Sequence, residues 1–217
     1  MNRRNFSKLA VMSGLIGLAP SELFSTLKKD HHLKISLAQW SLHKAIKSGK
    51  LSGLDFAKKS RSFGIDGIEY VSGLYTTHSN LLEKMSMDKL SDELLKRSNN
   101  YGIDNVLIMI DGQGNLASSN KKERMLAIDN HKRWIDFAAK LGCKTLRLNL
   151  NGDMNLEKWT DNSVKSLTTL SNYNDNINVV VENHGGFSSS GKYLANVMSK
   201  VDLNNCGPMT LDLLIKI

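Results

Sequence analysis

The triplet Glu182-Asn183-His184 is the strongest concentration of chemically capable side chains in the sequence. It directly follows a short apolar run at residues 178–181, and the glycine pair Gly185-Gly186 comes next. A carboxylate at the end of a buried strand can bind a divalent metal ion or take a proton from a carbon acid. The two glycines let the backbone turn away and let a ligand come close. On local sequence alone, a solvated glutamate beside a capping histidine is an equally good reading.

Other polar side chains stand near the ends of predicted strands, and they are Gln39, His43, Glu69, Asp111, Arg147 and Asn149. Among these, Gln39, His43, Glu69, Asn149 and the neighbouring His184 are candidates for contact with substrate hydroxyl groups. Arg147 could hold a phosphate or a carboxylate through its planar fork of N–H donors. For His43 the alternative is a helix cap, and for Glu69 it is a solvated sheet edge.

These side chains must be positioned by short β-type runs that alternate with longer amphipathic stretches. The sequence predicts strands at residues 34–40, 67–71, 105–110, 145–149 and 177–182, with a sixth starting at 209–212. It predicts helices at residues 54–63, 81–100, 122–141, 155–170 and 191–201. Asn155 has the residue type of a helix N-cap, and Gly142 that of a helix end.

Nearly apolar strands separated by helices predict a parallel sheet, and therefore an α/β fold. A doubly wound open sheet would give the same alternation of strands and helices along the sequence. However, residues 39–43 follow the first strand where that fold usually has a glycine-rich phosphate loop. Polar residues also gather where the strands end, and in a (β/α)8 TIM barrel those ends surround one active-site mouth. The barrel is therefore the favoured architecture.

Four segments, at residues 36–45, 130–143, 146–149 and 180–186, resemble the sugar phosphate isomerase/epimerase family of xylose-isomerase-like TIM barrels. The resemblance runs from Lys34 to Cys206. It implies a metal-dependent isomerase or epimerase that transfers a proton next to the carbonyl of a sugar or sugar phosphate. It also implies that Glu182 is both metal ligand and catalytic acid/base, and that Asp212 is a second ligand. The implied cofactor is a divalent ion, namely Mn²⁺, Mg²⁺, Co²⁺ or Zn²⁺.

A complete family site adds a histidine from strand seven and a glutamate from strand eight, and the 217-residue sequence offers no counterpart of either. A full eight-unit barrel takes about 250 residues. We therefore expect residues 34–217 to form an incomplete barrel of five to six βα units, marginally stable and weakly active. The alternatives are a non-catalytic carbohydrate-binding barrel and, less favoured because histidines are few, an endonuclease-IV-like phosphodiesterase.

The first residues resemble a twin-arginine export signal, with Arg3-Arg4 before an apolar run. We expect a signal segment at residues 1–26, a linker at 27–33 and a periplasmic location, with membrane contact only through the signal. The formal net charge of +8 is scattered over predicted helix faces, which argues against nucleic acid as a partner. Two cysteines give no disulfide framework.

Overall fold

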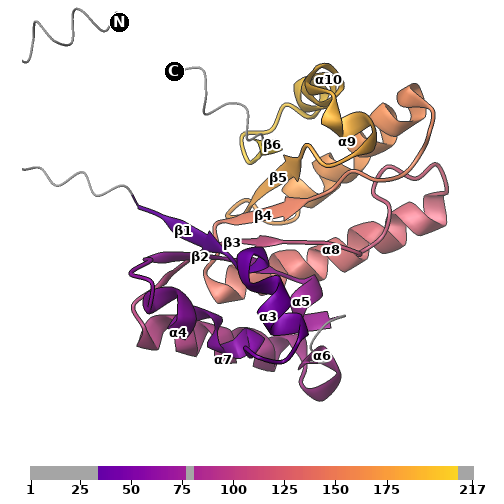
Figure 1. Cartoon of the computed structure of the whole chain (residues 1–217). Helices are drawn as coiled ribbons and strands as arrows, with labels where there is room; N and C mark the ends of the chain where they lie inside the picture. Colours follow the sequence, from indigo (N-terminus) through magenta and orange to yellow (C-terminus); the bar gives the residue numbers. More distant parts are fainter. Residues whose placement is uncertain (1–33, 77–80, 210–217) are drawn as a thin grey trace, which may run out of the picture. The chain divides into compact units, whose positions relative to one another are not determined.

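The computed structural model of the chain describes residues 34–76 and 81–209. Six parallel strands form one sheet in which each strand pairs with the next along the chain (Figure 1). The strands are β1 (Ser36–Ala38), β2 (Gly67–Val71), β3 (Asp104–Met109), β4 (Thr145–Leu148), β5 (Asn178–Glu182) and β6 (Cys206–Met209). Unbroken sequential pairing of parallel strands is the topology of a β/α barrel wall and confirms the predicted fold class.

Helices connect the strands. The α-helices are α3 (His43–Lys47), α4 (Phe56–Arg61), α5 (Gly73–Thr76), α6 (Leu81–Lys84), α7 (Met87–Asn100), α8 (Lys121–Leu141), α9 (Leu156–Ser171) and α10 (Gly191–Val201). Short 3₁₀ turns are η2 (Gln39–Leu42), η3 (Gly53–Asp55) and η4 (Gly186–Ser189). No helix in the described ranges is long and apolar enough to cross a membrane.

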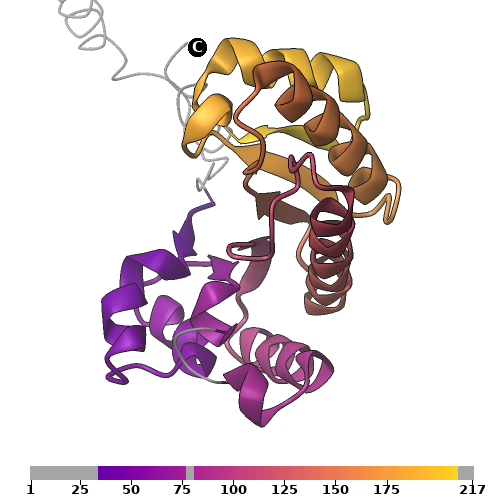
Figure 2. The same cartoon turned by 90° about the vertical axis from the view of Figure 1, so that its right-hand side faces the viewer.

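The long helices cover one face of the sheet and pack on one another in chain order, α4 on α7, α7 on α8, α8 on α9 and α9 on α10 (Figure 2). Alternate strand residues build this main core. Leu146 and Leu148 of β4, for example, are fully buried against the helices. Because side chains alternate along a strand, the residues between them point to the opposite face. The two faces therefore serve different purposes, one for packing and one for a site.

The predicted signals at helix ends are confirmed where the structure describes them. The side chain of Asn155 accepts a hydrogen bond from the backbone N–H of Lys158 at the start of α9. Gly142 ends α8 in the left-handed conformation, with φ of 82°. The predicted single helix at 81–100 is wrong, because the Ser86 side chain caps α7 and separates it from α6.

The sixth strand lies earlier than the sequence predicted, at Cys206–Met209, where Met209 pairs with Glu182. Pro208 lies within β6, although proline has no N–H to donate to a neighbouring strand. A strand that pairs on one side only can accept it, and in the described residues β6 pairs with β5 alone. The predictions for residues 1–33 and for Asp212 lie outside the described residues.

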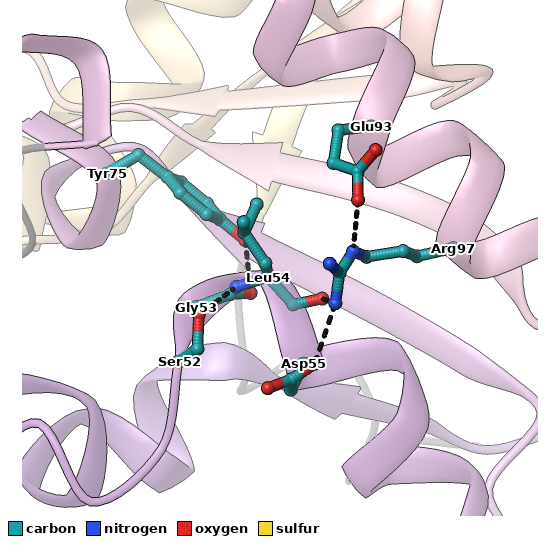
Figure 3. A network of polar contacts seen from close by, with 7 residues as sticks. All are labelled: Ser52, Gly53, Leu54, Asp55, Tyr75, Glu93 and Arg97. Atoms are coloured by element: carbon teal, nitrogen blue, oxygen red, sulfur yellow. Dashed lines mark hydrogen bonds and ion pairs between the residues drawn. The ribbon is translucent and has the colours of Figure 1, made fainter. Parts of the chain in front are cut away.

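Arg97 of α7 links this helix to η3 through polar contacts, as Figure 3 shows. Its guanidinium contacts Glu93 at 2.7 Å, Asp55 at 2.6 Å and the carbonyl oxygen of Leu54 at 3.3 Å. The last two contacts hold η3 against α7. This arginine between two carboxylates lies outside the cavity described below.

The loops that follow β3 and β4 are joined by backbone hydrogen bonds. The N–H of Ala117 donates to Asn151 at 2.9 Å, and the N–H of Asp153 donates to Ala117 at 3.1 Å. Gly152 lies between these bonds, and a Cβ there would come within 2.2 Å of the Ala117 carbonyl carbon. Only a glycine lets the two backbones approach this closely.

Cys143 and His131 are both buried in the helical layer. Burial raises the pKa of the Cys143 thiol to about 12, so it remains protonated and unreactive. Burial also lowers the pKa of His131, although a hydrogen bond of 2.7 Å between its Nδ1 and the Ala127 carbonyl opposes the effect. Both are packing residues.

We predict that Gly152→Ala lowers the free energy of unfolding by about 3 kcal/mol, near the upper end of typical overpacking costs. Either the added methyl group clashes with Ala117 or the loops separate. Urea unfolding followed by circular dichroism measures the change. Gly191→Ala is the control, because a Cβ there meets nothing within 4 Å. Equal stability of the two variants would contradict the close approach.

We further predict that His131 makes stability fall as the pH drops below about 6.5, the ordinary histidine pKa. Its folded pKa is lowered, so the unfolded chain takes up the proton first and acid favours unfolding. His131→Gln should reduce the slope of unfolding free energy against pH between about 6.5 and 5, by at most about 1.4 kcal/mol per pH unit. Unfolding curves across this range measure it, and an unchanged slope would refute it.

Candidate active site

A cavity of about 710 Å³ opens at the carboxyl end of the sheet, on the face away from the long helices. Each of the six described strands contributes one lining residue, namely Ala38, Val71, Met109, Arg147, Glu182 and Met209. The strand register places Val71 beside Met109 and Met109 beside Arg147. The walls are mostly apolar, and the polar groups concentrate on the β3, β4 and β5 side.

Arg147 is the central polar group of the cavity. Its side chain is only 9% exposed, and its Nη1 atom lies 3.1 Å from Asp111 Oδ1 and 3.0 Å from Glu182 Oε2. The three residues come from the ends of three neighbouring strands, β3, β4 and β5. A buried guanidinium is costly unless it is paired, and here each adjacent strand supplies a carboxylate.

Glu182 ends β5, and the chain turns away directly behind it. The N–H of His184 bonds to the Glu182 carbonyl at 2.9 Å, and Gly185 and Gly186 have φ of 72° and 54°. The predicted glycine turn is therefore present. It brings His184 Nδ1 to 3.6 Å from Glu182 Oε2, with the His184 side chain 69% exposed at the mouth. The predicted pair of carboxylate and imidazole thus faces the cavity.

Trp40 forms part of the rim, although the sequence did not single it out for a role in the site. The His43 ring stacks on it with centroids 4.5 Å apart, and Lys47 Nζ lies 4.8 Å from the indole centre. His43 Nδ1 also contacts the Trp40 carbonyl at 2.5 Å. His43 therefore supports the rim and does not line the cavity itself.

Gln39 was expected to contact substrate, and the structure places it elsewhere. The residue is fully buried, its Nε2 donates to Tyr75 Oη at 2.7 Å and its Oε1 accepts from the Val71 N–H at 3.0 Å. Ala38 faces the cavity, so the next residue points away from it. Burial also raises the pKa of Tyr75, which keeps this network neutral.

Two further candidates lie beside the cavity without lining it. Glu69 accepts a hydrogen bond from the Ser36 hydroxyl on β1 at 2.5 Å. Asn149 donates through Nδ2 to Asp111 Oδ1 at 3.0 Å, so it supports the carboxylate that pairs with Arg147. Of the predicted substrate-contacting residues, only Arg147 and His184 therefore line the cavity.

Asp111 lines the cavity, although its position in the sequence suggested no role beyond its place at a strand end. The signal was present, since Asp111 follows the buried strand β3 as Glu182 ends β5. Its importance comes from the contact with Arg147, which is 36 residues away in the chain. Such a pairing is visible only when the strand register is known.

The donor types at the mouth fit a divalent metal ion, because Glu182 and His184 offer a carboxylate oxygen and an imidazole nitrogen within reach of each other. In the ranges 34–76 and 81–209, no group of three or more His, Cys, Asp or Glu side chains is arranged to hold a metal. The predicted second ligand, Asp212, lies outside these ranges.

Residues 54–211 match the family described as xylose isomerase-like TIM barrel. The chain belongs to this family. No curated protein matches the sequence. Among solved structures, the chain is similar to a D-psicose 3-epimerase crystallised with D-fructose, with a TM-score of 0.64 and 16% identity over 82% of this chain and 63% of that one.

Two other members of the fold are similar at the same level. One is the IOLI protein with a bound zinc atom, with a TM-score of 0.62 and 16% identity over 81% of this chain and 62% of that one. The other is 3-keto-D-glucoside 4-epimerase from E. coli, with a TM-score of 0.59 and 13% identity over 71% and 61% of the two chains. At such identities the likeness shows the fold, and the chain spans about three fifths of each structure's length.

We predict that Gln39→Met lowers the free energy of unfolding by about 1–3 kcal/mol, because it leaves the buried Val71 N–H without its acceptor. Thermal and urea unfolding measure this. Gln113→Met is the control, because Gln113 is only part-buried and its side chain donates to the carbonyl of Asp111, two residues away. If Gln39→Met weakened sugar binding with no loss of stability, Gln39 would be a substrate contact after all.

Proposed function

We propose that this xylose isomerase-like barrel is a metal-dependent sugar isomerase or epimerase that transfers a proton at the carbon next to a carbonyl group. The observation that carries the proposal is the Glu182 carboxylate at the end of β5, inside a cavity of about 710 Å³ and held by Arg147. Family membership and the likeness to two sugar epimerases support this reaction class.

Glu182 is the proposed catalytic base. Its carboxylate is 29% exposed, so it is reachable from the cavity yet mostly shielded from water. The ion pair with Arg147 fixes one carboxylate oxygen and holds the group in a single orientation. A positioned base of this kind contributes about 10²- to 10⁴-fold to proton transfer. His184, exposed at the mouth, is placed to hydrogen-bond a substrate oxygen.

Arg147 and the rim position the substrate. A guanidinium has five N–H donors, more than the two contacts to Asp111 and Glu182 require, so it can also bond an oxygen of the sugar. The apolar side chains Val71, Met109 and Met209 and the rim residue Trp40 suit the C–H faces of a sugar ring. They also exclude water from the reacting carbon.

Glu182 would hold a divalent ion together with Asp212, which the family resemblance implies as the next ligand. The ion, when bound, polarises the carbonyl and hydroxyl oxygens and stabilises the negative charge that forms as the proton leaves. The zinc atom in the similar IOLI protein supports a divalent ion, and Mn²⁺, Mg²⁺, Co²⁺ and Zn²⁺ are all candidates.

A second candidate is a barrel that binds sugar without turnover. The ion pair between Arg147 and Glu182 Oε2 favours this second candidate, because a carboxylate oxygen bound to a guanidinium is not free to take a proton from a substrate. The two functions differ in one measurable property, since only the enzyme exchanges the hydrogen next to the carbonyl with solvent.

We predict that the protein, supplied with Mn²⁺, incorporates solvent deuterium into a ketose such as D-fructose, and that Glu182→Gln slows this at least about 100-fold because the base is lost. Proton NMR in D₂O measures the incorporation. Glu93→Gln is the matched control, because it also removes a carboxylate paired with an arginine, but outside the cavity. Sugar binding without deuterium incorporation by the wild type would favour the binding barrel instead.

A further inference from the structure

One nitrogen atom of Arg147 contacts two carboxylates at once. Its Nη1 donates a hydrogen bond to Asp111 Oδ1 at 3.1 Å and forms an ion pair with Glu182 Oε2 at 3.0 Å. The Arg147 side chain is 9% exposed, whereas those of Asp111 and Glu182 are 40% and 29% exposed. The cation is therefore the most deeply buried of the three charges, and it is the one that most needs a permanent partner.

Asp111 is held in place by contacts that do not involve Glu182. Its backbone N–H donates to Ser72 Oγ at 3.1 Å, and Ser72 is fully buried. Its Oδ1 atom also accepts a hydrogen bond from Asn149 Nδ2 at 3.0 Å. Both the main chain and the side chain of Asp111 are thus fixed beside the guanidinium, independently of the position of Glu182.

The proposed function gives the Glu182 carboxylate further partners. It has to bind a divalent ion and take a proton from the substrate, and His184 Nδ1 already lies 3.6 Å from its Oε2 atom. A bound ion places a second positive charge beside the carboxylate that Arg147 contacts, and the two cations repel each other. With Glu182 as its sole partner, the buried guanidinium would lose its compensation whenever that carboxylate turned to the ion or to the substrate.

We propose that Asp111 is a positioning residue that compensates the charge of Arg147 by itself, so that Glu182 can act as base and metal ligand without leaving a buried cation unpaired. The inference rests on the proposed function, because it explains how the base of that reaction becomes available. It also makes a statement about stability that involves neither sugar nor metal. Either carboxylate alone keeps Arg147 compensated, and the loss of both does not.

A double-mutant cycle on the full 217-residue chain tests this statement. Asp111→Asn and Glu182→Gln each remove a charge but keep an oxygen that can accept from Arg147. The control cycle is Asp55→Asn with Glu93→Gln around Arg97, which also contacts two carboxylates (Figure 3). The Arg97 side chain is 31% exposed, so water can solvate it when both carboxylates are lost.

Urea unfolding of the metal-free variants measures the folding equilibrium constants. We expect the Asp111→Asn/Glu182→Gln double variant to lose at least about tenfold more than the product of the two single losses, because only the double variant leaves Arg147 uncompensated. The control cycle should be multiplicative to within about twofold. A multiplicative cycle at Arg147, or equal coupling in the control, would overturn the proposal.

A third substitution keeps the test decisive if the double variant does not fold. Adding Arg147→Met removes the cation and leaves an apolar side chain in its place. The triple variant should therefore be more stable than the double variant, since no buried charge remains unpaired. A triple variant that is no more stable would show that the loss does not come from Arg147, and this too would overturn the proposal.

Kinetics test whether Asp111 acts on the base or on the substrate. With saturating Mn²⁺ and D-fructose, we expect Asp111→Asn to lower kcat for deuterium exchange at least about tenfold and to change KM by less than about threefold. Asp55→Asn should change neither. A rise in KM with kcat unchanged would make Asp111 a substrate contact and overturn its role as a positioning residue.

The two measurements separate this inference from the proposed function. If the wild type exchanges no hydrogen with solvent but the Arg147 cycle is strongly coupled, the compensation by Asp111 stands and the enzyme assignment falls. If the wild type exchanges hydrogen while the Arg147 cycle is multiplicative, the enzyme assignment stands and the role of Asp111 falls.

Discussion

The buried guanidinium of Arg147 is the constraint on which the rest of the site depends. Breaking a buried ion pair by removing one partner typically costs about 3–5 kcal/mol, because the remaining charge is left uncompensated. Here the partners come from both neighbouring strands, so the pairing is satisfied only when β3, β4 and β5 lie side by side in their observed register. The interaction that prepares the cavity for chemistry therefore also fixes the sheet around it.

Strand alternation explains how one short strand serves the core and the site together. In β4, Leu146 and Leu148 are buried under the helices, whereas Arg147 points into the cavity. The apolar residues supply the stabilisation that offsets the burial of the charge between them. The backbone hydrogen bonds between the loops at Ala117 and Gly152 continue the pairing of β3 and β4 beyond the strand ends. The cavity is thus held by backbone pairing as well as by side chains.

Local signals made most of the fold predictable, and contacts between distant residues made part of the site unpredictable. The apolar run before Glu182 and the glycines after it are local, so the sequence predicted both the strand and the turn. The direction of Gln39 depends on which neighbour faces the cavity, and a shift of one residue reverses it. The partnership of Asp111 with Arg147 joins positions 36 apart in the chain, and no single-sequence pattern encodes it.

Asp111, Arg147 and Glu182 together carry a formal excess of one negative charge, which favours a cation at the mouth, where Glu182 supplies a carboxylate and the exposed His184 lies beside it. A divalent ion bound there would share the Glu182 carboxylate with Arg147, so the second carboxylate, Asp111, keeps the guanidinium compensated while Glu182 turns to other partners. If Glu182 were the sole partner of Arg147, each new contact of the Glu182 carboxylate would leave the buried guanidinium unpaired. Asp111 removes that conflict, because its own contact with Arg147 does not depend on Glu182.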